Sequence, residues 1–131
     1  MEEIFHILPN SIQSLLKQTS DSFLQKIEEI RVRVHRPLEI IAEGKPIYPT
    51  INQKRYVATI EDSVHIINKL SNYSLYAFEE ELKRGYITIK GGHRVGLAGK
   101  VAIEHGKVKT IKDISSYNIR IAREKIGIAE P

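Results

Sequence analysis

The sequence predicts a single α+β domain whose antiparallel sheet carries helices on one side. Its 131 residues suit one domain, and the hydrophobic (41%) and charged (27%) fractions are ordinary for a folded globular protein. Residues 11–27 and 59–85 show helical spacing, whereas residues 30–42 and 86–121 show the alternation of strands. Short turns separate the expected strands, and short turns join antiparallel neighbours.

Two short helices are expected near the N-terminus. Ser11 can cap the first helix, and Ser20 or Asp21 can start the second. Each helix has apolar residues at helical intervals that would face the core: Ile12, Leu15 and Leu16 in the first, and Phe23, Leu24 and Ile27 in the second. Residues 1–27 are therefore expected to form a helical segment ahead of the sheet.

A pair of strands should follow. Residues 30–34 read Ile-Arg-Val-Arg-Val, which predicts a strand with one buried face and with Arg31 and Arg33 on the other. Pro37 helps to break this strand, residues 38–42 read as a second strand, and residues 43–46 turn again. Because so few residues separate the two strands, we expect an antiparallel pair.

Two more helices are expected between residues 59 and 85. Thr59 and Asp62 have the spacing of a capping box, which predicts a helix start. The apolar positions expected to face the core are Ile60, Val64, Ile67 and Leu70 in this helix, and Leu75, Phe78 and Leu82 in the next. Gly85 suits the left-handed conformation that often follows a helix.

The rest of the chain is predicted to form strands. Gly91-Gly92 is a two-residue hairpin signal, and Gly106 marks a later turn. Four apolar residues share one parity and are expected to face one core: Val95, Leu97, Val101 and Ile103. Ile119 and Ile121 belong to a last alternating strand.

The sequence lacks the residues that several kinds of catalytic site require. Cysteine is absent, so neither disulfides nor thiolates are available. Residues 96–101 resemble a P-loop, but Arg94 stands where a glycine is needed and Val101 where Ser or Thr would reach Mg²⁺. Gly96 and Gly99 are instead interpreted as bulge or close-approach positions. The histidines lack metal-ligand spacing and no Gly-x-Ser-x-Gly elbow occurs, so no metal site or catalytic residue is predicted.

The positive charge is concentrated in the second half. Residues 1–82 hold 9 Lys and Arg against 12 Asp and Glu, whereas residues 83–125 hold 11 against 3. This half would attract phosphates or an acidic partner, or its basic side chains could simply face water. The acidic N-terminus does not read as a signal peptide, and no apolar run approaches the roughly 20 residues of a membrane span. A cytoplasmic chain is therefore expected, at most peripheral to a membrane.

Arginines on strands are the strongest candidates for a binding site. Arg31, Arg33, Arg94 and Arg120 all lie on predicted strands, and a rigidly mounted guanidinium grips phosphate oxygens in a bidentate way. The alternative for each is an arginine that faces water. Nucleic-acid binding by a sheet would need exposed aromatic residues, for which Tyr86 and Tyr117 are a weak signal.

Four segments carry a family resemblance. Residues 28–33 read Glu-Glu-Ile-Arg-Val-Arg and residues 36–38 Arg-Pro-Leu. Residues 74–82 read Ser-Leu-Tyr-Ala-Phe-Glu-Glu-Glu-Leu. In the next segment, residues 85–88 read Gly-Tyr-Ile-Thr and residues 91–97 read Gly-Gly-His-Arg-Val-Gly-Leu. The last segment, residues 113–123, reads Asp-Ile-Ser-Ser-Tyr-Asn-Ile-Arg-Ile-Ala-Arg. These motifs, in this order, closely resemble the stage III sporulation protein AA family from about Glu28 to Gly127.

The resemblance implies a fold and a domain organisation. In that family this region precedes a RecA-like ATPase domain similar to those of type II secretion and type IV pilus motors. We therefore expect a helical segment over residues 1–27, a PAS-like domain over residues 28–127, and the start of a linker to an absent ATPase domain at residues 128–131. No Walker motif is present, so this chain alone is not expected to be an enzyme.

The resemblance also implies a function. The chain is expected to be the N-terminal regulatory or positioning domain of a sporulation secretion-type ATPase, cytoplasmic in the mother cell and peripheral to the membrane. By position, Arg94 and Arg120, with Arg123 behind them, match arginines that neutralise nucleotide phosphates in the motors, and Arg31 and Arg33 are candidate interface residues. ATP and Mg²⁺ would bind in the full-length protein only.

The implied partners are proteins. They are the chain's own C-terminal ATPase domain, identical subunits in a hexamer, and membrane channel proteins of the sporulation apparatus. Two other functions stay open: a docking module for a membrane partner without nucleotide contact, and nucleic-acid binding, which is the less favoured of the two.

Overall fold

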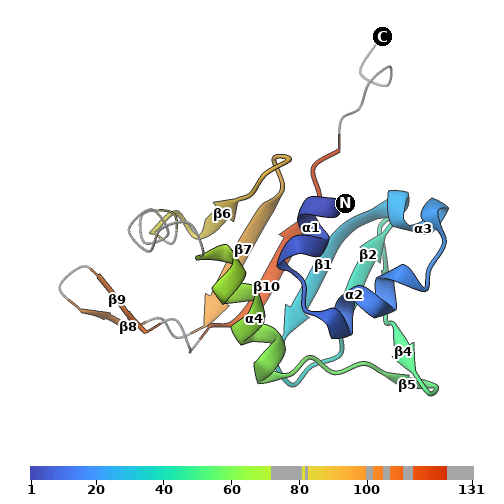
Figure 1. The fold of residues 1–131 in the computed structure, drawn as a ribbon, viewed down its shortest axis with the longest axis horizontal. Helices are drawn as coiled ribbons and strands as arrows, with labels where there is room; N and C mark the ends of the chain where they lie inside the picture. The colour runs from blue at the N-terminus through green and yellow to red at the C-terminus, as the bar shows by residue number, and fades with distance from the viewer. Residues whose placement is uncertain (72–80, 82, 100–101, 105–106, 111–113, 124–131) are drawn as a thin grey trace, which may run out of the picture.

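The computed structural model of the chain describes residues 1–71, 81, 83–99, 102–104, 107–110 and 114–123 (Figure 1). The helices in these residues are α1 Glu2–Ile7, α2 Asn10–Lys17, α3 Asp21–Lys26 and α4 Ile60–Leu70. The strands are β1 Ile27–Arg33, β2 Glu39–Ala42, β3 Lys45–Ile47, β4 Thr50–Ile51, β5 Lys54–Arg55, β6 Tyr86–Thr88, β7 Arg94–Gly99, β8 Ala102–Glu104, β9 Lys107–Thr110 and β10 Ile114–Arg120.

Six of these strands form one antiparallel sheet in the order β3-β2-β1-β10-β7-β6. The pairing of β1 with β10 joins residues far apart in the sequence, with Ile30 opposite Ile119. The hairpins β4–β5 and β8–β9 are separate two-stranded sheets. The sheet therefore depends on contacts between the first and last thirds of the chain, which residue patterns alone do not reveal.

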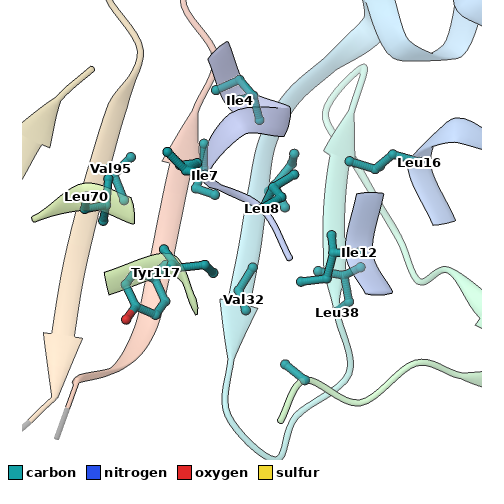
Figure 2. Close-up of a cluster of buried hydrophobic side chains, with 14 of the residues drawn as sticks. Ile4, Ile7, Leu8, Ile12, Leu16, Val32, Leu38, Leu70, Val95 and Tyr117 are labelled. Atoms are coloured by element: carbon teal, nitrogen blue, oxygen red, sulfur yellow. The ribbon is translucent and has the colours of Figure 1, made fainter. Parts of the chain in front are cut away.

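Helices α1, α2 and α4 cover one face of this sheet (Figure 1). Their apolar side chains meet those of the strands in one core, shown in Figure 2. Fully buried members of this core include Ile4, Leu8, Ile12, Leu38 and Tyr117. The predicted antiparallel sheet with helices on one side is confirmed, and its likeness to PAS domains stays a prediction.

The start of α4 confirms the predicted capping box. The Thr59 hydroxyl accepts the Asp62 N–H at 3.1 Å, and the Asp62 carboxylate accepts the Thr59 N–H at 3.0 Å. The same carboxylate accepts the Ser11 hydroxyl at 2.8 Å and the Tyr56 hydroxyl. Asp62 therefore ties α4 to α2 and to the segment before α4, which explains how a carboxylate can be buried here.

Other local predictions hold. Ile30 and Val32 are buried while Arg31 and Arg33 lie on the other face of β1, and β2 pairs antiparallel with β1. Ser20 caps α3 by accepting the Phe23 N–H at 3.1 Å. The hairpin at Gly91-Gly92 also forms, although its turn is longer than predicted. The Ile89 N–H donates to the His93 carbonyl at 2.9 Å, which leaves residues 90–92 in the turn.

The N-terminal helices differ from the prediction. Helix α1 was not predicted, and α2 begins at Asn10 with Pro9 as its N-cap. Ser11 is therefore not a cap, and its hydroxyl donates to Asp62 instead. Ile27 belongs to β1 and not to the helix before it, because α3 ends at Lys26.

The orientation of α4 was also wrong in part. Ile60 and Val64 are 54% and 37% exposed, whereas Ile67 and Leu70 are buried as predicted. Ser63 lies on the buried side because its hydroxyl donates to the Ile114 carbonyl of β10 at 2.6 Å. The buried side of α4 is thus formed by Ser63 together with Ile66, Ile67 and Leu70, and Ile66 was missing from the predicted set.

The four apolar residues expected to face one core, Val95, Leu97, Val101 and Ile103, do not lie on one continuous strand. Strand β7 ends at Gly99, and Ile103 belongs to the separate β8–β9 hairpin. Gly99 has φ +141° and lies beside a register shift of β10, which fits its predicted place near a bulge. Gly96 pairs regularly with Asn118, and a Cβ there would make only ordinary contacts, so the interpretation of Gly96 was wrong.

Some predictions fall outside the described residues. They concern Leu75, Phe78, Leu82, Val101 and Gly106. Gly85 is described, and its φ of +88° matches the conformation predicted for a residue after a helix. Strand β10 contains Ile119 as expected, begins at Ile114 and ends before Ile121.

Candidate functional site: the open face of the sheet

The sheet has a second face, on which none of the helices labelled in Figure 1 packs. We call this surface the open face. It carries the residues that alternate with the buried positions of the strands: Glu39 and Ile41 in β2, Glu29, Arg31 and Arg33 in β1, Ser116, Asn118 and Arg120 in β10, Arg94, Gly96 and Ala98 in β7, and Tyr86 and Thr88 in β6. Four of the predicted arginines are therefore brought together on one surface.

Arg94 and Arg120 are directly opposite each other on neighbouring strands β7 and β10. Side chains at such positions begin roughly 5 Å apart, and like charges placed there repel each other. Both side chains are exposed, and that of Arg120 is 74% exposed. The structure thus places two sequence-distant arginines at opposed positions, which is an electrostatically unfavourable arrangement.

Each guanidinium is held on the side away from the other. Arg120 leans toward β1, where its Nε lies 3.4 Å from a carboxylate oxygen of Glu29. Arg94 leans toward β6, and its guanidinium carbon lies 4.9 Å from the centre of the Tyr86 ring. These contacts draw the Arg120 guanidinium toward β1 and the Arg94 guanidinium toward β6.

Arg31 and Arg33 have a different environment. Arg31 pairs with Glu29 and also donates to Glu39 at 2.9 Å, and Arg33 reaches the same Glu39 oxygen at 3.3 Å. The two glutamate side chains are only 12% and 14% exposed. These two arginines are therefore already paired with carboxylates within the domain.

Tyr48 extends this network. Its hydroxyl donates to the second Glu39 oxygen at 2.8 Å, and the Arg55 guanidinium lies 4.1 Å from the centre of its ring. The hydrogen bond from Tyr48, followed by that from Arg31, lowers the pKa of Glu39. The hydrogen bonds to Glu29 and Glu39 raise the pKa of Arg31. These shifts favour the ionised carboxylate of Glu39 and the protonated guanidinium of Arg31, the forms that pair with each other.

Arg123 does not join the open face. Its guanidinium donates to the carbonyl of Leu24 at 2.6 Å and to that of Ile27 at 3.0 and 3.3 Å. These carbonyls lie at the C-terminal end of α3, where a positive charge is favourable. The structure thus places Arg123 in a helix-capping role, away from Arg94 and Arg120.

The two tyrosines considered for base stacking separate. Tyr86 is partly exposed on the open face, but Tyr117 is fully buried and its hydroxyl donates to the Ser63 carbonyl at 2.9 Å. Burial raises the pKa of Tyr117 to about 12. Tyr117 is a core residue, which removes half of the aromatic support for nucleic-acid binding.

Sequence reasoning missed the glutamates of the open face. Glu29 and Glu39 share the parity of Arg31 and Arg33, so the same alternation that placed the arginines could have placed them. It also missed His93, which is 5% exposed and accepts the Ala122 N–H through Nδ1 at 3.0 Å. No sequence pattern indicates that contact, because it joins residues of separate segments.

Other kinds of site find no support in the part of the chain that the structure describes. Gly96 to Gly99 lie within strand β7 and not in the loop of a P-loop. No three metal-ligating side chains gather among the described residues. None of the described helices is both long and apolar enough to cross a membrane.

Comparison with known proteins decides the family. The profile of the family described as "Sporulation stage III, protein AA" matches residues 1–131, which is the entire chain. The chain belongs to this family. The resemblance seen in the arginine-bearing strands thus extends to residues 1–27 as well.

One curated relative and one solved structure are similar to this family member. "Stage III sporulation protein AA" of Bacillus subtilis (strain 168) is 52% identical over all 131 residues, and the chain spans 41% of that relative's length. The X-ray structure of the Legionella pneumophila ATPase DotB has 12% sequence identity and a TM-score of 0.47, over 88% of this chain and 29% of that one.

Proposed function

We propose that this chain is the N-terminal regulatory domain of a sporulation secretion-type ATPase and that its open face recognises nucleotide phosphates. Arg94 and Arg120 contact ATP that the following domain binds together with Mg²⁺. The observation that carries the proposal is the placement of these two arginines directly opposite each other, on strands and exposed. Membership in the stage III sporulation protein AA family supports the biological setting.

The electrostatics of the pair favour an anion. Two guanidiniums on opposite positions repel each other, and a phosphate between them would attract both and remove that cost. Each arginine can give two parallel hydrogen bonds to phosphate oxygens, which fixes geometry as well as charge. The partners that hold them now, a carboxylate and an aromatic ring, are single and partly solvated contacts that an anion can replace.

The wider setting is part of the same proposal. The relative from Bacillus subtilis is more than twice as long as this chain, which leaves room for an ATPase domain after it. The full-length protein acts as a hexamer in the cytoplasm of the mother cell, next to the membrane and its channel proteins. Arg31 and Arg33 shape an interface through their network with Glu39, and Arg123 supports the site from outside it.

The test is ATP turnover by the full-length protein. Arg94→Ala and Arg120→Ala should each lower turnover by a factor on the order of 10³, the effect of arginines that stabilise a transferring phosphoryl group. ATP affinity should change much less, because other residues hold the nucleotide.

Arg84→Ala is the matched control, because it removes the same charge from an exposed arginine outside the sheet. Its turnover should equal that of the wild type. If Arg94→Ala and Arg120→Ala also retain turnover within about twofold, neither arginine contributes to the reaction and the proposal is wrong.

A docking module for a protein partner is the second candidate. Among the residues whose burial the structure describes, the exposed large hydrophobic residues lie between residues 47 and 64: Ile47, Ile51, Val57, Ile60 and Val64. Apolar groups kept at a surface often mark contacts with another protein. Under this reading, Ile60→Ser with Val64→Ser would abolish recruitment of the full-length protein to membranes and leave ATP turnover unchanged.

A further inference from the structure

Three successive residues after the last strand are each bound to a different part of the domain. The Ile121 N–H donates to the Glu28 carbonyl at 3.0 Å, which extends the pairing of β1 with β10. The next N–H, of Ala122, donates to Nδ1 of His93 at 3.0 Å, in the turn between β6 and β7. These two bonds hold neighbouring residues to β1 on one side of β10 and to the β6–β7 turn on the other.

The third residue is held by its side chain. Arg123 gives three hydrogen bonds to the carbonyls of Leu24 and Ile27 at the end of α3. Charge-assisted bonds of this kind are about twice as strong as neutral ones. We call Ile121, Ala122 and Arg123 the exit clamp, because residues 124–131 continue the chain from it.

His93 has a specific environment within this arrangement. Its side chain is nearly buried, and Nε2 lies 3.7 Å from a carboxylate oxygen of Glu3 in α1. The N-terminal amino group lies 3.6 Å from the same carboxylate oxygen, and Arg123 is the other nearby charge. Burial lowers the pKa of His93, while Glu3 opposes this shift. His93 therefore stays neutral near pH 7, with Nδ1 as an acceptor.

The turn that carries His93 leaves no space for a side chain at Gly91. Gly91 has φ +95°, and a Cβ there would lie 2.8 Å from Nε2 of His93 and 3.3 Å from Cδ of Glu3. Glycine is therefore required for the histidine to reach Ala122. The contact between this turn and the departing chain depends on at least three positions, which indicates a built arrangement and not a chance contact.

We propose that the exit clamp fixes the direction in which the chain leaves the sheet and that protonation of His93 releases one of its three contacts, that of Ala122. A single tether would let residues 121–123 swivel, whereas three tethers to three elements fix both their position and their direction. A proton on Nδ1 turns this atom from an acceptor into a donor, so it can no longer bind the Ala122 N–H. The clamp stands without the proposed phosphate site, and it would orient that site relative to the following domain.

The first test is amide hydrogen exchange of the 131-residue chain at pH 7. Arg123→Ala should lower the protection of Ile121 and Ala122 by about tenfold, because charge-assisted hydrogen bonds are lost. Protection at Ile119, inside β10, should stay unchanged, and Arg84→Ala should change none of these amides. If Ile121 and Ala122 of the wild type exchange as in an unstructured peptide, the clamp is absent and the proposal is overturned.

The second test concerns the proton. Protection of Ala122, corrected for the intrinsic rate, should fall about tenfold as His93 becomes protonated, and it should hold in His93→Asn. Asparagine keeps an oxygen acceptor close to the place of Nδ1 but cannot gain a proton there.

If His93→Asn does not fold, ¹⁵N shifts of the His93 ring in the wild type decide the same point. Protonation of Nδ1 should coincide with the loss of Ala122 protection. A ring that titrates while Ala122 stays protected would overturn the role of His93.

The third test uses the full-length protein, with spin labels on the open face and in the following domain. Arg123→Ala should broaden the distance distribution between the labels, whereas Arg84→Ala should not. Equal widths in the wild type and in Arg123→Ala would contradict the clamp. No nucleotide is needed, so this result is independent of whether Arg94 and Arg120 bind phosphate.

Discussion

The two faces of the sheet are built from the same strands but carry opposite chemistry. In β10, Tyr117 and Ile119 point to the helices and are fully buried, whereas Asn118 and Arg120 lie on the open face. The covered face is mainly apolar, and two of its polar residues, Ser63 and Tyr117, are hydrogen-bonded. The open face holds four arginines and two glutamates. One face therefore accounts for stability, and the other is available for recognition.

The largest expected difference between the faces is in core packing. Ile119→Ala should lower the free energy of unfolding by about 2–5 kcal/mol, because it removes buried methyl groups and leaves a cavity. Arg120→Ala, the next residue on the other face, should change it by less than about 0.5 kcal/mol. Urea unfolding of both variants measures this directly. Equal losses would mean that Arg120 has a structural role.

The next largest loss of unfolding free energy is expected when the hydrogen bonds of Asp62 on the covered face are removed. Asp62→Ala removes the capping box and the acceptor of the Ser11 and Tyr56 hydroxyls, and it should cost about 1–3 kcal/mol of unfolding free energy. Glu61→Ala is the control, since Glu61 is an exposed acidic residue in the same helical turn. The same loss in both variants would point to helix-end charge and not to the hydrogen bonds.

Much of this comparison follows from the sequence. Alternation placed Ile30 and Val32 inward and Arg31 and Arg33 outward, and the Thr59–Asp62 spacing gave the start of α4. These features depend on neighbours within a few residues, which a sequence shows directly.

What the sequence could not show depends on contacts between distant segments. The pairing of Arg94 with Arg120 requires the register of β7 with β10, and the role of Arg123 requires α3 beside the end of β10. Helix α4 buries Ser63, which donates to β10, on the same side as Ile66, whereas the predicted set had placed Ile60 and Val64 inward. Each of these features is set by contacts between distant segments, and the local residue pattern did not predict it.

Acid should lower the free energy of unfolding through His93 and His65. Burial lowers the pKa of His93 and of His65, so their folded forms resist protonation while the unfolded chain binds protons near pH 6.5. The stability is complete above pH 6.5 and falls as the pH drops below it, by at most about 1.4 kcal/mol per pH unit and group. Urea unfolding between pH 7.5 and 5.5 tests the sign. Stability that rises with acidification over this range would contradict it.

The smallest effect is expected in the network of the open face. Tyr48→Phe removes the hydrogen bond that contributes most to the lowered pKa of Glu39, so this pKa should move back up toward its ordinary value. Global stability should change little, because Glu39 keeps its ion pairs with Arg31 and Arg33. Carboxyl chemical shifts of Glu39 over an acid titration give the measurement. An unchanged pKa would mean that the arginines alone set the charge of Glu39.

In the proposed function, Arg94 and Arg120 act together on one phosphate. A double-mutant cycle on ATP turnover of the full-length protein tests it, with Arg94→Ala, Arg120→Ala and the double variant. If both arginines grip one phosphate, the double variant should lose little more than the larger single loss, each single loss being on the order of 10³-fold. Losses that multiply fully would show that the two arginines act independently, and unchanged turnover would show that the open face does not contact the nucleotide.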